Sequence, residues 1–350
     1  MNQRKIAVLF GGCSSEYSVS LQSAHAIITN MNIDRYDKVL IGITRDGNWY
    51  RYYGSTDCIL DDTWHERTEE CIPVMVSLNR NDHGIIEIFK NYIKRTRLDA
   101  IFPVLHGKNG EDGTVQGLFE LADIPVIGCG TLCSALCMDK NRAHKLVAQT
   151  GIRIPKSVVL TGPVEGKQLL QLVSQLQYPL FVKPVKAGSS FGITKVNHKR
   201  SLSIAVKLAF EHDNEVIIEE NIEGFEVGCA VLGNQELTLG EVDEIELSAG
   251  FFDYTEKYTL KSSKIHIPAR VSEEMAGRIK ETAALIYRTL GCRGFARVDL
   301  FLTPEGEIVF NEVNTIPGFT SHSRYPNMMK GIGLSFDTIL DRLIELGMEQ

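Results

Sequence analysis

Several features that would assign a protein to a special class are missing from this sequence. The chain has 350 residues, of which only 2 are tryptophans. Charged residues make up 23% of the chain, and the net charge is −7 at pH 7. An acidic chain of ordinary composition is a poor match for nucleic acid or for an anionic membrane surface, both of which attract basic proteins. We therefore expect no nucleic-acid partner and no membrane partner, and we favour a small-molecule ligand.

Long apolar runs are also missing. The longest, as in "KIAVLF" and "LDAIFPVL", have the length of strands rather than of membrane spans, and no signal-peptide core precedes the first polar turn. The 8 cysteines form no regular framework, which is typical of reduced thiols. Together these absences predict a cytoplasmic location.

Three of the cysteines, Cys129, Cys133 and Cys137, are closely spaced. This spacing is compatible with a metal site, but the segment holds no CxxC pair and no ladder of histidines beside it. We interpret the three as small residues that pack around a turn and the start of a helix.

The hydrophobic pattern predicts an α/β protein with some α+β elements, in three regions: 1–130, 131–222 and 223–350. In the first region, strand and helix signals alternate, as in a βαβ arrangement with buried parallel strands. Polarity rises between Arg51 and Asp82, where we expect an irregular insertion. The second region begins with "TLCSALCMDKNRAHKLVAQTG", which we interpret as one helix that ends at Gly151.

In the third region, "GFARVDLFLTPEGEIVFNEVNT" predicts a hairpin that carries a metal site. Glu312 and Asn314 are two residues apart and share a face of one strand, while Asp299 lies on the partner strand. Three such oxygen ligands suit Mg²⁺, and Arg297 shares the face of Asp299. A solvated edge hairpin is the alternative, but the apolar residues between these groups argue against it.

Upstream, "FVKPVKAGSSFGITKV" places Lys183 on a strand before a loop of glycine and serine. A lysine and backbone N–H groups can bind phosphate, although such a loop alone is usually just a turn. Lys140 is a second candidate phosphate ligand, or else an ordinary helix lysine. In "EVIIEENIEGFEVG", the backbone near Glu219 could read adenine and Glu226 could accept from a ribose hydroxyl; a solvated acidic linker is the alternative.

Taken together, these motifs resemble the D-alanine:D-alanine ligase family of ATP-grasp enzymes. "LFGGCSSEYSVSL" is similar to the first loop of the family, where Glu16 matches the residue that holds the ammonium group of the first D-alanine. "LHGKNGEDGTVQG" is similar to the signature His-Gly-x-x-Gly-Glu-Asp-Gly, and "EVNTIPGFTSHSRYP" to the closing motif. The resemblance implies an ATP-grasp fold with an N-terminal Rossmann-like domain, and a homodimer.

It also implies ATP and two Mg²⁺ ions as cofactors, with Mn²⁺ able to substitute. The implied catalytic residues are Glu16, Ser189, Tyr258, Arg297 and Gly318. The implied nucleotide-binding residues are Lys140, Lys183, Ser190, Glu219, Glu226 and Lys257, and the metal ligands are Asp299, Glu312 and Asn314. The implied substrate residues are His106, Phe252, Ser323 and Arg324, although His106 could equally be a structural turn residue.

The second substrate distinguishes members of this family. Tyr258 resembles the users of D-alanine and D-serine and argues against D-lactate, whereas Arg324 in "SRYPNMM" resembles the vancomycin-resistance subgroup. A cation in this subsite can help to organise a hydroxyl, so we favour a ligase that joins D-alanine to D-serine. A D-alanine:D-alanine ligase of normal cell-wall synthesis is the alternative. A non-catalytic nucleotide sensor is disfavoured because the phosphate and metal residues are all present.

Overall fold

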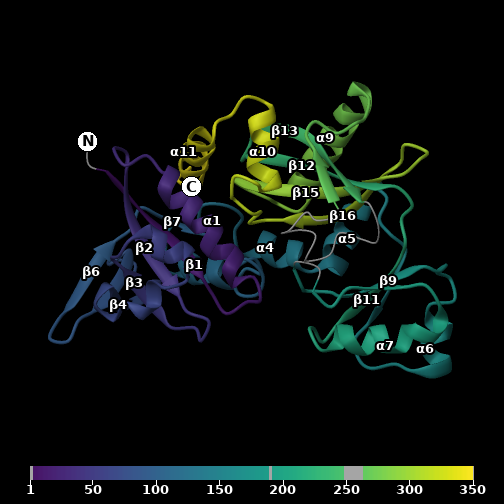
Figure 1. Ribbon diagram of the computed structural model, residues 1–350, viewed down its shortest axis with the longest axis horizontal. Helices are drawn as coiled ribbons and strands as arrows, with labels where there is room; N and C mark the ends of the chain where they lie inside the picture. Colours follow the sequence, from purple (N-terminus) through teal and green to yellow (C-terminus); the bar gives the residue numbers. More distant parts are fainter. Residues whose placement is uncertain (1–2, 189–190, 248–262, 350) are drawn as a thin grey trace.

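A computed structural model describes residues 3–188, 191–247 and 263–349. These residues form three β-sheets, of seven, four and five strands. In Figure 1 the seven-stranded sheet lies in the left half of the molecule, and the five-stranded sheet lies above the four-stranded one in the right half. Phe252, Lys257 and Tyr258, and also Ser189 and Ser190, lie outside the described residues.

The first sheet has the order β6-β5-β4-β3-β2-β1-β7. At one edge, β1 (Arg4–Gly11) lies between its parallel neighbours β2 (Tyr36–Ile43) and β7 (Ala100–Pro103). Six consecutive residues of β1 are buried, because helices cover a parallel sheet on its faces. The helices of this part are α1 (Tyr17–Asn30), α2 (Thr56–Leu60) and α3 (Thr114–Leu121).

The polar segment that we expected to be an irregular insertion instead extends this sheet. It contains the antiparallel strands β3 (Trp49–Tyr52) and β4 (Cys71–Val76), followed by β5 (Gly84–Ile88) and β6 (Ile93–Arg97). The short 3-10 helices η1 (Trp64–Glu66) and η2 (Thr68–Glu70) lie between β3 and β4. Burial of Trp64 against aromatic rings of the sheet fixes this segment, which has too few apolar residues for a periodic signal.

The segment that we expected to be one helix after residue 130 is two helices. α4 (Thr131–Met138) ends at Asp139, whose backbone is extended, and α5 (Lys140–Ala148) begins at the next residue. The Asp139 carboxylate accepts a hydrogen bond from the N–H of Arg142, so it acts as the N-cap of α5. The predicted end at Gly151 agrees with its positive φ of 85°.

The second sheet has the order β10-β9-β11-β8 and carries the predicted phosphate lysine. Its strands are β8 (Ser157–Leu160), β9 (Leu180–Pro184), β10 (Thr194–Val196) and β11 (Val216–Glu220). Helices α6 (Gly166–Leu172) and α7 (Lys199–Phe210) lie along one side of this sheet (Figure 1).

The third sheet has the order β14-β13-β12-β15-β16 and contains the predicted hairpin. The hairpin is formed by β15 (Phe295–Leu302) and β16 (Ile308–Asn314), beside β12 (Phe225–Gly233), β13 (Leu237–Leu247) and β14 (Ser263–His266). The amphipathic helix α9 (Glu273–Thr289) packs on β12, β13 and β15, and the Ser272 hydroxyl caps it by accepting from the N–H of Met275.

The end of the chain returns to the first sheet. After α10 (Arg324–Gly331), helix α11 (Phe336–Gly347) packs beside α1 and β7 (Figure 1). Arg35 donates to Asp341 at 2.5 Å and to Glu345 at 2.6 Å across this contact. Within the described ranges, no helix is long and apolar enough to cross a bilayer.

Candidate active site

A cavity of about 610 Å³ lies between the second and third sheets. This volume is typical of clefts that enclose a nucleotide-sized ligand. Five residues predicted from the sequence line it: Lys140, Lys183, Glu219, Glu226 and Glu312. Apolar side chains also line it: Phe181, Ile193, Ile222, Phe225 and Phe301. The mixture of an apolar wall with charged groups suits a flat ring attached to a polyanion.

The two predicted phosphate lysines reach the cavity from different elements. Lys183 on β9 is buried, and its Nζ lies 2.7 Å from the Glu219 carboxylate on the neighbouring strand β11. Burial alone would lower the pKa of Lys183, but the charge and hydrogen bond of Glu219, together with the charges of Glu312 and Glu226, outweigh burial and the pKa is raised. Lys140, the first residue of α5, donates to the carbonyl of Ala187 at 2.9 Å and lies 3.2 Å from the Glu312 carboxylate. Each amine therefore lies beside a carboxylate at the cavity wall.

The predicted metal ligands meet on the hairpin. Asp299 on β15 is directly opposite Glu312 on β16, and the Asn314 amide donates to the Asp299 carboxylate at 2.9 Å. Arg297 donates to both oxygens of Asp299, at 2.8 and 2.7 Å. Glu312 lines the cavity, whereas Asp299 is only 1% exposed. The set offers two carboxylates and an amide oxygen on adjacent strands, a donor set that suits a hard divalent cation.

Arg324 lies beneath the hairpin in a buried group of charges. From the start of α10, its guanidinium donates to both oxygens of Asp243, at 2.6 and 2.8 Å, and to Glu226 at 2.8 Å. It also lies 3.4 Å from Asp299. We expected Arg324 to help organise the hydroxyl of the acceptor, but α10 packs on β12 and β13 and the side chain bonds to their carboxylates. The arginine thus links the cavity residue Glu226 to the metal-ligand candidate Asp299.

A second group of functional candidates lies at the end of the hairpin that faces the first sheet. Glu16 precedes α1 and is buried, and a Cβ added at Gly107 or at Gly188 would lie 2.5 or 2.7 Å from its carboxylate. Gly188 belongs to the glycine and serine loop, so the described start of this loop, at Gly188, lies against Glu16. The structure therefore brings together two motifs that are far apart in the sequence.

Glu111, in the "HGKNGEDG" motif, was missed as an individual residue. Although the residue is partly exposed, its carboxylate accepts from the N–H groups of Gly107 at 2.9 Å and Ile316 at 3.2 Å. Burial raises the pKa of Glu111 to about 8, and the nearby negative charge of Glu16 adds to the increase. The motif indicated a functional segment, but only the fold shows that the Glu111 carboxylate connects the loop at Gly107 to the segment after β16.

The remaining substrate candidates lie near this connection. His106 is buried, its Nε2 is 3.3 Å from the Ser23 hydroxyl, and burial lowers its pKa to about 4. Ser23 Oγ in turn accepts from the N–H of Phe319, next to Gly318. A Cβ added at Gly318 would lie 3.0 Å from Ser323 Oγ, so glycine permits the close approach of the two. Both roles that the sequence left open for His106, in substrate binding and in the turn, stay predictions.

Comparisons with known proteins place the whole arrangement in one family. The model of the D-Ala–D-Ala ligase N-terminus matches residues 5–129, and that of the C-terminus matches residues 146–345. The chain belongs to the D-alanine:D-alanine ligase family. Members of this family are ATP-dependent ligases, and this chain is one of them.

Several members of the family are similar over essentially their whole length. A crystal structure of the VanG D-Ala:D-Ser ligase from Enterococcus faecalis is 63% identical, with a TM-score of 0.92, over 99% of this chain and 100% of that one. The vancomycin B-type resistance protein VanB of Enterococcus faecalis is 44% identical over 100% of both chains. A D-alanine–D-alanine ligase of Caldicellulosiruptor bescii is 43% identical over 100% of this chain and 96% of that protein. The predicted family and its ATP-grasp fold are confirmed.

Loss of the Arg324 cation should destabilise this ligase strongly. Arg324→Leu would leave the carboxylates of Asp243 and Asp299 buried without their shared partner, which typically costs about 3–5 kcal/mol. Arg80→Leu is the matched control, because Arg80 also pairs with a carboxylate, Asp123, but the two side chains are 67% and 60% exposed. Such an exposed pair contributes about 0–1 kcal/mol. Urea denaturation should separate the two variants, and equal losses would show that the buried group does not depend on Arg324.

The raised pKa of Glu111 should appear in the pH dependence of stability. The folded protein binds this proton more tightly than the unfolded chain, so the stabilisation is complete below the ordinary carboxyl pKa and is lost as the pH rises through about 8. Between about pH 5 and pH 8.5, we expect wild type to lose about 1–3 kcal/mol more stability than Glu111→Gln. The exposed Glu305→Gln should follow wild type. Parallel curves for wild type and Glu111→Gln would contradict the assignment.

Proposed function

We propose that this chain is an ATP-dependent ligase that joins D-alanine to D-serine for the modified peptidoglycan precursors of vancomycin resistance. The observation that carries the proposal is the 63% identity to the VanG D-Ala:D-Ser ligase, which spans 99% of this chain. The sequence favours D-serine because of Arg324, and this residue is buried beside the hairpin.

The reaction needs ATP because a carboxylate is a poor acyl donor. An oxygen of the first D-alanine attacks the γ-phosphorus of ATP, which gives D-alanyl phosphate and releases ADP. The amine of D-serine then attacks the acyl carbon, phosphate leaves with its bonding electrons, and the amine loses a proton. Negative charge first grows on the transferring phosphoryl group and then on a tetrahedral oxyanion.

The cavity between the second and third sheets would hold the ATP. Its apolar side chains would enclose the adenine, with the backbone near Glu219 as the reader of the base and Glu226 as the ribose acceptor. Lys140 and Lys183 would bind the phosphates, with Ser190 and Lys257 assigned to the same ligand. Each of the two described lysines is held by a carboxylate, at 3.2 and 2.7 Å, for which phosphate oxygens would compete.

Asp299, Glu312 and Asn314 would hold the Mg²⁺ ions, or Mn²⁺ in their place. The oxygen donor set fits such an ion, which supplies positive charge to neutralise the phosphates when bound. Arg297 holds Asp299 through two hydrogen bonds, and this fixes one ligand in orientation. A preset ligand costs less reorganisation when charge develops in the transition state.

The first D-alanine would lie between Glu16 and the segment after β16. Glu16 would accept from its ammonium group, and the N–H of Gly318 would donate to the oxyanion. The contact of the glycine and serine loop with Glu16 supports a closed site, with Ser189 and Tyr258 as the groups that position the substrate and exclude water.

The acceptor would lie beside Ser323 and Phe252. The Arg324 guanidinium pairs with Asp243, Glu226 and Asp299. It would therefore influence the acceptor by holding these carboxylates in place rather than by donating a hydrogen bond to the acceptor itself. We therefore assign Arg324 as a positioning residue. The homodimer and the cytoplasmic location stay predictions.

A D-alanine:D-alanine ligase is the second candidate, because a D-alanine–D-alanine ligase of Caldicellulosiruptor bescii is 43% identical over this entire chain. A hydroxyl changes the binding of a small substrate only modestly, so a site for D-serine also accepts some D-alanine.

Product analysis distinguishes the two candidates. With ATP, D-alanine and D-serine at equal concentrations, we expect D-alanyl-D-serine to exceed D-alanyl-D-alanine, measured by mass spectrometry. A predominance of D-alanyl-D-alanine would support the second candidate. ATP binding without ADP release in the presence of both amino acids would instead identify a nucleotide sensor.

The metal assignment is tested by Glu312→Gln, which keeps the shape of the side chain and removes its charge. We expect turnover at saturating Mg²⁺ to fall by about two orders of magnitude or more, as for the loss of one electrostatic catalytic group. Glu305→Gln is the control, since this glutamate lies exposed in the turn of the same hairpin. Normal turnover in Glu312→Gln would remove Glu312 from the metal site.

A further inference from the structure

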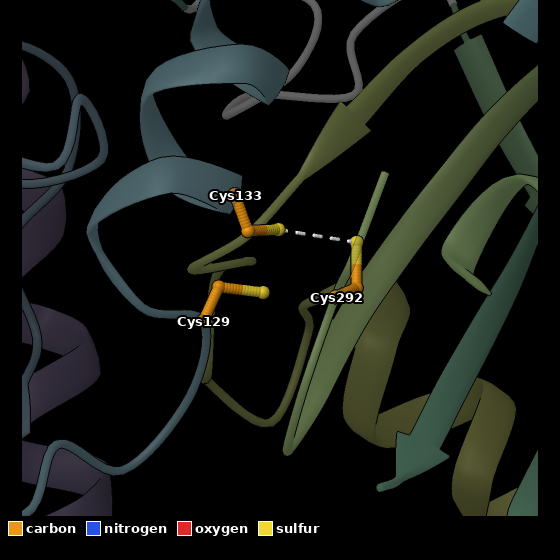
Figure 2. Close-up of side chains that lie close together, drawn as sticks. All are labelled: Cys129, Cys133 and Cys292. Atoms are coloured by element: carbon orange, nitrogen blue, oxygen red, sulfur yellow. Dashed lines mark hydrogen bonds between the residues drawn. The ribbon is translucent and has the colours of Figure 1, made fainter. Parts of the chain in front are cut away.

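A group of thiols outside the cavity has no role in the ligase reaction. Cys129, Cys133, Cys137 and Cys292 are all buried, with exposures of 3 to 6%. Their side chains come from the loop before α4, from α4 itself and from the turn after α9, and Figure 2 shows three of the sulfur atoms converging. The fourth, Cys137, lies one helical turn after Cys133.

Local structure explains why these thiols meet. Cys133 and Cys137 are four residues apart on α4 and share a face of the helix. Cys129 lies between Gly128 and Gly130, and Cys292 lies between two glycines with positive φ, Gly291 and Gly294. A Cβ at Gly294 would lie 3.0 Å from the Cα of Gly128, so the two turns come closer than bulkier residues would permit.

The separations of the sulfur atoms are those of a metal site. A tetrahedral zinc ion with Zn–S bonds of about 2.3 Å requires its sulfur ligands to be about 3.8 Å apart. Cys133 Sγ lies 3.5 Å from Cys292 Sγ and 3.8 Å from Cys137 Sγ. The sulfur atoms of Cys129, Cys133 and Cys292 all lie within 4.8 Å of one another. Shifts of less than one ångström in the sulfur positions would therefore complete the coordination.

We propose that Cys129, Cys133 and Cys292 bind a soft divalent metal ion of the zinc class, with Cys137 within reach as a fourth ligand. Thiolate sulfur favours such ions over the hard Mg²⁺ of the nucleotide site. The ion would be a structural one, because all four thiols are buried and none of them lines the nucleotide cavity. Each thiol that binds gives up its proton to water.

Such an ion would connect parts of the chain that are distant in sequence. Cys133 lies on the helix before α5, whose first residue is the phosphate-binding candidate Lys140, and Cys292 lies between α9 and the hairpin strand β15. The apolar contacts of these thiols already hold α4 against the third sheet. Metal ligation would strengthen this attachment. The sequence pattern concealed the site because Cys292 is more than 150 residues away from the other three.

Co²⁺ provides a direct test, because thiolate-bound Co²⁺ has an intense charge-transfer absorption. The full chain is purified with a phosphine reductant, stripped with a chelator and titrated with Co²⁺ and then Zn²⁺ under anaerobic conditions. We expect one thiolate-bound ion per chain, with the absorption appearing on Co²⁺ addition and disappearing when Zn²⁺ displaces it. Cys133→Ser and Cys292→Ser should each weaken binding by at least about a hundred-fold, since loss of even a supporting group costs 10–100-fold.

Cys229→Ala is the matched control, because this buried cysteine lies on β12 in the same apolar core and outside the thiol group. It should retain full metal binding. Cys129→Ser provides a further ligand variant if either of the others fails to fold, as judged by circular dichroism. Absence of charge transfer in wild type, equal weakening in Cys229→Ala, or a Cys133–Cys292 disulfide in the untreated protein, detected as the loss of two hydrogens by mass spectrometry, would each overturn the proposal.

Discussion

Two carboxylates, Asp299 and Glu312, lie opposite each other on adjacent strands at the edge of the cavity, and like charges this close require cations. Arg297 and Arg324 supply them to Asp299, and Lys140 supplies one to Glu312. Three different elements place these cations beside the two carboxylates. β15 carries one arginine, α10 the other, and α5 begins at the lysine.

This arrangement explains how a strongly charged site is stable before any ligand binds. An isolated buried charge would cost several kcal/mol, whereas a paired and hydrogen-bonded charge costs much less. Binding of a metal ion and a polyanion can then proceed by exchange of partners. The carboxylate of Glu312 would pass from Lys140 to the metal, and Lys140 would pass to a phosphate. The chemistry of the site thus follows from the same pairs that stabilise it.

Much of this site could be predicted because its residues lie on regular elements with short-range patterns. The alternation along β16 placed Glu312 and Asn314 on one face, and a hairpin between them and Asp299 was predicted from its turn. Lys183 at the end of β9 was predicted in the same way.

The features that were missed depend on contacts between distant segments. The partners of Arg324 come from β12 and β13, about 80 to 100 residues away, so its direction could not be inferred from its own motif. The break at Asp139 depends on a single capping carboxylate within a continuous helical pattern. Strands β3 and β4 pack near one buried tryptophan, Trp64, and are only four and six residues long, with a polar segment between them, so neither shows a clear period.

The account is tested most directly by anomalous diffraction from crystals grown with Mn²⁺ and a non-hydrolysable ATP analogue. It predicts an anomalous peak bounded by the carboxylates of Asp299 and Glu312 and the amide oxygen of Asn314, with Lys140 moved from Glu312 to a phosphate oxygen. A nucleotide bound with no peak beside these three residues, and with Lys140 still paired to Glu312, would contradict it.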